Sequence, residues 1–196
     1  MNEICYVRFL NASANSPAFD IYVNDKLFAS ALSYKNFTEY FKGNMGEYNI
    51  KIYKAGDKKN IILQENVELF MNNIYTIAII DISNGLTLNL IGDHLRNLDK
   101  NYAYIRFINL SPSLQNLDIV INNVLVISDL EYGVESNYLK ILPGTYNFKA
   151  ISYGELVLEN PRLVLDAGKI YSGYIVGNEG DIKILLPLEG ATYLKF

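Results

Sequence analysis

The chain has 196 residues, half of them hydrophobic, and its 17 basic and 21 acidic side chains give a net charge of −4. A hydrophobic fraction of this size can fill a core, so we expect a folded chain. No basic run provides the positive surface that nucleic acid binding requires, and no apolar run approaches the roughly 20 residues of a membrane span. The sequence therefore predicts neither a nucleic acid partner nor a membrane span.

The chain contains one cysteine, Cys5, and one histidine, His94. A single cysteine cannot form an internal disulfide, and one Cys with one His cannot complete a zinc site. We therefore expect no metal, no cofactor, and either a reducing compartment or a bacterial surface. No signal peptide is visible, which predicts a cytoplasmic protein as written, or one that reaches a spore or cell surface by another route.

The segment 6–53 is repeated at 104–151 without insertion or deletion, and 18 of the 48 aligned positions are identical. After a shift of two residues, the alignment resumes with Ile74 against Ile170. Two copies are too few for a solenoid, and each copy has the size of a small domain. The duplication therefore predicts two like domains in tandem.

Taken in chain order, the first copy is a series of short strands. Residues 19–23 alternate apolar and polar side chains, which is typical of a strand with one buried face. Asn24 and Asp25 then predict a two-residue hairpin turn, because both residue types tolerate a positive φ. The predicted strands are Ile4–Leu10, Phe19–Val23, Lys26–Leu32, Phe37–Phe41, a strand through Tyr48 and Ile52, Ile61–Leu69, Ile74–Asp81 and Leu86–Ile91.

The second copy repeats this order, with Asn122 and Asn123 at the hairpin turn. Its later predicted strands are Ser136–Leu139, Tyr146–Ala150, Leu156–Leu165, Tyr171–Gly177 and Ile182–Leu186. No segment sustains the 3.6-residue apolar period of a helix. We predict an all-β protein of two tandem antiparallel β-sandwich domains, immunoglobulin-like or fibronectin-like, at 1–93 and 103–196, joined by a linker at 94–102.

One charged pair is kept in both copies, Arg8 with Asp20 and Arg106 with Asp118. The first interpretation is a structural ion pair between neighbouring strands, because a buried charge without a partner is costly. The second interpretation is an anion or ligand clamp, because arginine offers a planar fork of donors.

Four tyrosines also recur in both copies, at Tyr34, Tyr40, Tyr132 and Tyr138. On an exposed sheet face they could stack on sugar rings, and they are the candidate ligand-binding residues. Alternatively, they pack at the corners of the sandwiches.

Two polar segments could suggest calcium, Asp81–Gly85 and Gly177–Asp181, but both lack the acidic ligand set of known calcium loops and predict turns. No phosphate-binding loop or nucleophile elbow occurs. The only histidine lies in the predicted linker, so a catalytic triad would need it to reach into a domain. We therefore predict that the chain is not an enzyme.

The runs Tyr-Val-Arg-Phe-Leu-Asn-Ala-Ser at 6–13 and Pro-Ala-Phe-Asp-Ile-Tyr-Val-Asn-Asp at 17–25, followed by Gly46-x-Tyr48, resemble the bacterial family known as domain of unknown function 4397. The second copy is similar at 105–112, 117–123 and 143–146. The resemblance implies β-sandwich modules, often in tandem and usually on exported or envelope proteins, with no established chemistry.

The chain departs from this family at Asn11 and Asn109, where the family usually has histidine. Its richness in Asn, Ile, Lys and Tyr resembles proteins of AT-rich bacterial genomes, which suggests a spore envelope. Our leading hypothesis is a non-enzymatic structural or interaction module of a bacterial envelope or spore layer, which binds a protein partner or self-associates. The alternative is a carbohydrate-binding module that holds a glycan on exposed tyrosines.

Overall fold

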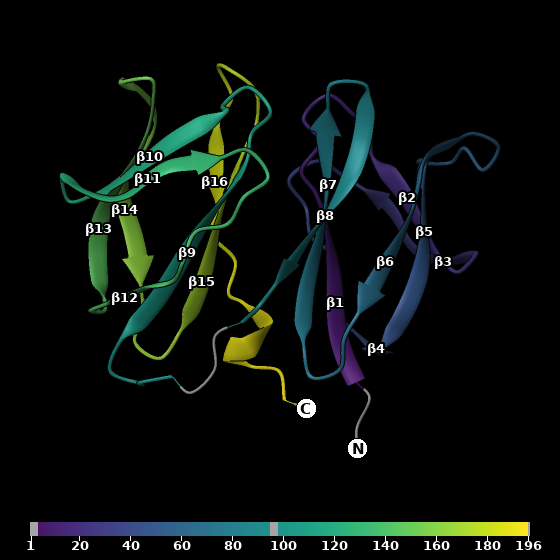
Figure 1. Ribbon diagram of the computed structural model, residues 1–196, viewed down its shortest axis with the longest axis horizontal. Coiled ribbons are helices and arrows are strands. Elements are labelled where there is room, and N and C mark those ends of the chain that lie inside the picture. Colours follow the sequence, from purple (N-terminus) through teal and green to yellow (C-terminus); the bar gives the residue numbers. More distant parts are fainter. Residues whose placement is uncertain (1–3, 95–97, 196) are drawn as a thin grey trace. The chain divides into compact units, whose positions relative to one another are not determined.

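The computed structural model describes residues 4–94 and 98–195 (Figure 1). The chain divides into two compact units, Met1–His94 with Leu194–Phe196, and Leu95–Tyr193, here called the first and second domains. Residues 95–97 of the predicted linker, and residues 1–3, lie outside the described residues.

The first domain is a sandwich of two four-stranded sheets (Figure 1). One sheet has the order β4 (Phe41–Asn44), β1 (Ile4–Asn11), β7 (Ile74–Ile82) and β8 (Gly85–Gly92). The other has the order β3 (Lys26–Leu32), β2 (Phe19–Val23), β5 (Gly46–Lys54) and β6 (Ile61–Leu69). Buried apolar side chains from both sheets form one core cluster between them.

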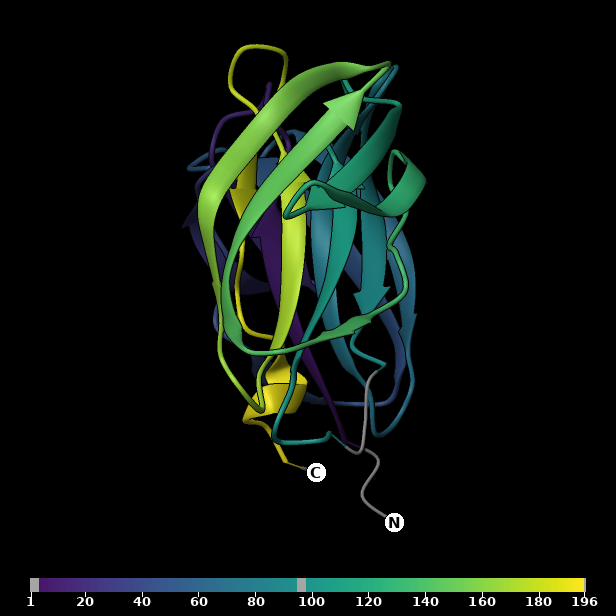
Figure 2. The same cartoon turned by 90° about the vertical axis from the view of Figure 1, so that its left-hand side faces the viewer.

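The second domain repeats this strand order. One sheet has the order β12 (Leu139–Ile141), β9 (Ala103–Leu110), β15 (Ile170–Val176) and β16 (Lys183–Leu185). The other has the order β11 (Val124–Glu131), β10 (Asn116–Ile121), β13 (Gly144–Ser152) and β14 (Glu155–Leu165), with the β13–β14 hairpin in light green in Figure 2. A 3₁₀ helix, η1 (Gly190–Thr192), follows. The predicted all-β fold of two tandem sandwiches is confirmed.

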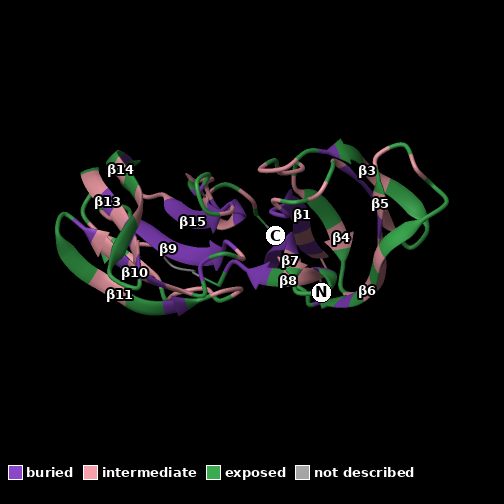
Figure 3. Ribbon diagram, turned by 90° about the horizontal axis from the view of Figure 1, so that it is seen from above, coloured by how far each residue is buried: buried purple, intermediate pink, exposed green. Residues whose placement is uncertain are grey.

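Each sandwich contains one parallel pair that the antiparallel prediction did not include. β1 pairs with β7, and β9 pairs with β15 in the same way. These strands can run in the same direction because the chain passes through the opposite sheet between them. They are buried along most of their length, as parallel strands usually are, and Figure 3 shows β9 and β15 mostly in purple.

The predicted hairpin turns are confirmed in both domains. Asn24 and Asp25 have φ angles of 48° and 65°, and Asn122 and Asn123 have φ angles of 49° and 64°. Two successive residues with positive φ give the turn whose twist matches the flanking strands. The carboxamide of the first asparagine of each turn also accepts a hydrogen bond, at 2.9 Å, from a backbone N–H of β5 in the first domain and of β13 in the second.

The strands predicted at Phe37–Phe41 and Ser136–Leu139 are wrong. The structure has β4 and β12 there, which begin at Phe41 and Leu139. The preceding residues carry the chain from one sheet to the other and make only single bridges, Leu10 with Phe37 and Ile108 with Glu135. A crossing segment cannot keep the register of a strand in either sheet. No helix in the described part of the chain is long and apolar enough to cross a membrane.

Candidate functional site

The predicted ion pairs of Arg8 with Asp20 and of Arg106 with Asp118 do not form among the residues that the structure describes. Both aspartates instead accept hydrogen bonds from the backbone. The Asp20 carboxylate accepts from the N–H of Ala31 at 2.8 Å, and the Asp118 carboxylate accepts from the N–H of Asp129 at 3.0 Å.

The reason lies in a bulge of the strands β3 and β11. Ala31 and Asp129 have φ angles of 51° and 58°, which few residues other than glycine adopt. Their strands shift register there against β2 and β10. The bulge leaves one backbone N–H without a partner in the β ladder, and a carboxylate from the neighbouring strand accepts a hydrogen bond from it. Asp20 and Asp118 therefore stabilise a backbone irregularity rather than an arginine.

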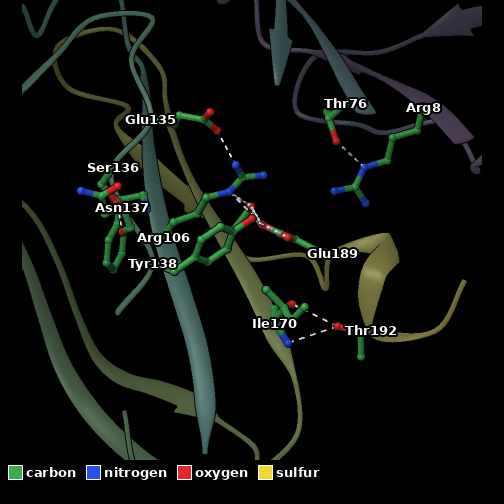
Figure 4. Close-up of polar contacts among 12 residues, drawn as sticks. Arg8, Thr76, Arg106, Glu135, Ser136, Asn137, Tyr138, Ile170, Glu189 and Thr192 are labelled. Carbon is green, nitrogen blue, oxygen red and sulfur yellow. Dashed lines mark hydrogen bonds and ion pairs between the residues drawn. The ribbon is translucent and has the colours of Figure 1, made fainter. Parts of the chain in front are cut away.

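Arg106 lies at the centre of a buried polar cluster in the second domain (Figure 4). Its side chain is 1% exposed, and its Nε lies 2.8 Å from Glu189 Oε1 and donates to Ser172 Oγ at 3.0 Å. Ser172 Oγ donates to the same Glu189 oxygen at 2.5 Å, and an Nη of Arg106 contacts Glu135. The Arg106 guanidinium is thus paired with two carboxylates, of which Glu189 is fully buried.

Tyr138 completes this cluster. Its hydroxyl donates to the Glu189 carboxylate, 2.8 Å from either oxygen, and its ring lies 4.9 Å from the Arg106 guanidinium carbon. Burial alone lowers the pKa of Arg106, but the charge of Glu189, with Tyr138 and Glu135, raises it above its usual range. Arg106 therefore keeps its charge, and a fixed cation satisfied by its neighbours favours a structural role.

The first domain has a related cluster around Arg8, which is 5% exposed. Arg8 Nε donates to Thr76 Oγ1 at 2.9 Å, as Arg106 does to Ser172. The rings of Phe37 and Tyr40 each lie 4.5 Å from its guanidinium carbon (Figure 4 shows Arg8 and Thr76). Phe37 stands where the second domain has Glu135, so the two clusters hold their arginines with different chemistry.

The position equivalent to Glu189 in the first domain is Asp93. The backbone N–H of Asp93 donates to the Ile74 carbonyl, and that of Glu189 donates to the Ile170 carbonyl, so the two acids occupy the same place in the fold. Both are fully buried. Thr76 corresponds to Ser172 and Asp93 corresponds to Glu189 at the same offset between the two copies. This recurrence of a hydroxyl and an acid could have identified the clusters from the sequence.

The four repeated tyrosines are all half-buried. Tyr40 and Tyr138 pack on the buried arginines, and Tyr34 carries the Lys35 ammonium 4.7 Å from its ring centre. The backbone N–H of Tyr132 donates to the Gln115 carbonyl. Packing of Tyr40 and Tyr138 on the buried arginines agrees with the structural interpretation for these two tyrosines.

Asn11 and Asn109 are fully buried, and their hydrogen bonds hold the end of the first strand of each domain in place. The Asn11 carboxamide donates to the Leu32 carbonyl at 3.0 Å and accepts from the Ser13 N–H at 3.1 Å. Asn109 makes the same two kinds of contact with Leu130 and Ser111. Both side chains are therefore held by hydrogen bonds within the fold, which favours a structural role at these positions.

Exposed apolar side chains recur at the β5–β6 and β13–β14 hairpins, and also at Leu27 and Leu125 of the β2–β3 and β10–β11 hairpins, a feature that the sequence analysis missed. Ile61 and Ile62 follow the β5–β6 turn with exposures of 46% and 44%, and Tyr153 and Leu156 flank the β13–β14 turn with exposures of 85% and 54%. We call these two pairs the apolar tips. In the described residues, no group of three or more His, Cys, Asp or Glu side chains could hold a metal ion.

The likeness to solved structures is weak. A family CBM26 module from Eubacterium rectale Amy13K, solved with maltoheptaose, is 9% identical, with 93% of this chain and 96% of that chain covered and a TM-score of 0.30. A streptococcal virulence factor described as binding alpha-glucan is 11% identical, with 97% and 99% covered and a TM-score of 0.27. Both scores are too low to bear on function.

No curated protein matches the chain. The sequence pattern of the family described as "Domain of unknown function (DUF4397)" matches residues 5–120 and 103–192, which together span nearly the whole chain. The two matches correspond to the two repeats, as the resemblance predicted. The chain belongs to the DUF4397 family, with two copies of its domain in tandem.

Proposed function

We propose that this chain is a non-catalytic interaction module that associates with a second copy of itself through the apolar tips. The observation that carries this proposal is the recurrence of exposed apolar side chains at the same hairpin of both domains. Single exposed apolar residues are common on protein surfaces and need no explanation. Their repetition at the same hairpin, with Ile61 and Leu156 at equivalent positions beside edge strands that end a sheet, is the pattern expected of a contact surface.

Edge strands support association because one side of their backbone is not hydrogen-bonded within the sheet. β6 and β14 each end the order of their sheet. β14 carries Pro161 and a register shift near its middle, which hinder pairing along its full length. The turn-proximal half, next to Tyr153 and Leu156, lacks the proline, and its own register shift lies between Leu156 and Leu158. We therefore place the proposed contact at the tip of the hairpin, in the side chains rather than along the strand.

The duplication also explains why association would not stop at a dimer. A chain with two like contact surfaces can bind two neighbours at once. Repetition of that contact gives an open-ended assembly, such as a layer. We therefore propose an envelope or spore layer as its location, in keeping with the resemblance to a family of mostly exported proteins. The other form of this hypothesis is that the chain binds a different protein partner.

Substitution of the apolar tips tests this proposal. Ile62→Lys combined with Leu156→Lys places a charge on each tip, and charged edges are how natural sheets avoid pairing. We expect the double variant to remain monomeric in light scattering at concentrations at which the unmodified chain forms larger species. Val124→Lys, which changes another exposed apolar residue (61% exposed), is the matched control and should assemble normally. Equal assembly by the double variant would overturn the proposal.

A further inference from the structure

The first domain contains a cavity of about 340 Å³ between its two sheets. On one side the sheets are fastened together by Glu65 of β6, whose carboxylate accepts from Thr87 Oγ1 at 2.8 Å and from the Leu88 N–H at 3.3 Å. On the other side lie the edge strands β3 and β4, and residues of both strands line the cavity. The cavity is therefore a cleft that opens between β3 and β4.

The walls of the cleft are apolar and reach the core. Six lining residues belong to the buried core cluster of the domain, namely Val7, Phe9, Ile50, Val67, Leu69 and Ile77. At the mouth, the rings of Phe28 on β3 and Phe41 on β4 lie 4.2 Å apart. A concave, mostly apolar space of a few hundred Å³ with a small number of polar groups is typical of small-molecule sites.

The second domain shows which residues create this space. Gly43 of the first domain corresponds to Ile141, and Ile50 corresponds to Phe148. Both larger side chains pack in or against the core cluster of the second domain, where Phe148 stacks on Phe107 with ring centres 5.2 Å apart. A side-chain carbon added at Gly43 would meet its nearest neighbours only at 3.6 and 3.7 Å. The cleft thus depends on small residues at positions that the other repeat fills.

Two lysines line the cleft, Lys26 of β3 and Lys42 of β4, and only Lys26 differs between the repeats, because Lys140 stands at the position of Lys42. Lys26 begins β3 directly opposite Val23, so the two side chains lie on the same face of the sheet, and Val23 packs against the core cluster. The Lys26 ammonium forms no ion pair with another residue that the structure describes. The second domain has Val124 at this position. An apolar cleft with a lysine at its mouth has the charge pattern that complements a chain with an anionic end.

The groove found in the second domain has the opposite character. It has a volume of about 520 Å³ and lies between β11 and the crossing segment 134–139. Asp129, Glu131 and Glu135 are among its lining residues, and these carboxylates repel an anion. The two repeats have therefore diverged in the surface that they offer to a ligand.

We propose that the first domain binds a linear aliphatic monocarboxylate, with its alkyl chain in the cleft and its carboxylate at the Lys26 ammonium. The alkyl chain fits the apolar walls, and the ammonium groups of Lys26 and Lys42 select the charge of the head group. This proposal is independent of the apolar tips, because none of the tip residues lines the cleft. The second domain, with Ile141, Phe148 and Val124, does not share the site.

Calorimetric titration of the full chain with saturated monocarboxylates from hexanoate to dodecanoate, each below its micelle concentration, tests the proposal. We expect saturable binding at one site, with affinity rising about fourfold for each added methylene until the cleft is full. Gly43→Ile, which copies the second domain, should abolish binding. The φ of Gly43 is not in the positive range, so isoleucine is compatible with the backbone there. Ile50→Phe provides an independent block if Gly43→Ile does not fold.

The head group is tested separately. Lys26→Val should weaken the carboxylate but leave the alkanol of equal length unchanged, while the control Lys58→Val, at a lysine that does not line the cleft, should alter neither. The proposal is overturned if no chain length binds saturably, or if folded Gly43→Ile and Ile50→Phe both bind as the unmodified chain does. It is equally overturned if alkyl ammonium ions bind as tightly as carboxylates, which would indicate a cleft for an uncharged or cationic apolar group.

Discussion

Arg106 illustrates how a residue repeated in a sequence can be structural. Its charge is fully buried, and Glu189, Ser172 and Glu135 supply the partners that make this burial tolerable. The sequence analysis interpreted Arg8 and Arg106 either as members of structural ion pairs or as a ligand clamp, and it paired both with aspartates that bind the backbone instead. Asp118 is identical in both copies, whereas Glu189 follows the two-residue shift and aligns with a different acid, Asp93.

Arg106→Met should destabilise the protein by about 3–5 kcal/mol, because the variant leaves the Glu189 carboxylate buried without its cation. The double variant Arg106→Met with Glu189→Met should recover much of this loss, because it removes both charges. Urea unfolding followed by circular dichroism measures both. Lys183→Met, at an exposed and weakly paired lysine, is the control and should have little effect. A double variant as unstable as the single one would refute the charge-pairing account.

Cys5 offers a second test at the level of one residue. Burial raises the pKa of the Cys5 thiol above its usual range, although a hydrogen bond with the backbone acts in the opposite direction. A raised pKa means that less thiolate is present at a given pH, and thiolate is the reactive form. We expect alkylation of Cys5 by iodoacetamide at pH 8 to be much slower in the folded chain than in urea. Equal rates would show that the end of β4 does not cover the thiol.

At the level of the element, the β2–β3 and β10–β11 hairpins were the most predictable parts of the fold. Strict alternation of side chains and a pair of residues that tolerate positive φ determine a hairpin locally, without help from the rest of the chain. The bounds Phe19–Val23 and Lys26–Leu32 were therefore confirmed without change. The parallel pairing of β1 with β7 was not predictable in this way, because its partners are separated by most of the domain.

Two substitutions at the second-domain turn test its geometry. Asn122→Ala should destabilise the protein by about 1–2 kcal/mol, because alanine disfavours positive φ and cannot accept the hydrogen bond from the Asn147 N–H. Asn123→Gly should be close to neutral, because glycine readily adopts positive φ and loses only a long contact with Lys149, at 3.3 Å. Thermal unfolding measures both, and equal effects would contradict the assigned roles.

The candidate sites were less predictable than the strands. The apolar tips arise because short turns project Tyr153 and its neighbours beyond the sheet, and exposure of this kind depends on the tertiary fold rather than on the local pattern. The first-domain cleft depends on the absence of side-chain volume at Gly43 and Ile50. The sequence of the first copy alone does not indicate that side-chain volume is missing there. The smaller volume becomes apparent only when these positions are compared with Ile141 and Phe148 in the structure of the second domain.

At the level of the whole molecule, the two domains share one fold, and their internal contacts have diverged less than their surfaces. The features that hold each sandwich together recur: the asparagine turn, the aspartate at the bulge, the buried asparagine and the buried arginine. The surfaces between edge strands differ, with a cationic apolar cleft in the first domain and an acidic groove in the second. A shared scaffold with different surfaces is consistent with a binding role in which the repeats have separate ligands but a common mode of assembly.

The central claim, that two like contact surfaces on one chain drive open-ended association, is tested most directly by sedimentation velocity of the unmodified chain over a concentration series. The account predicts a sedimentation coefficient that rises continuously with concentration, with no single end state, because each added chain brings a further free tip. A single monomeric species that persists at high micromolar concentration would contradict the account.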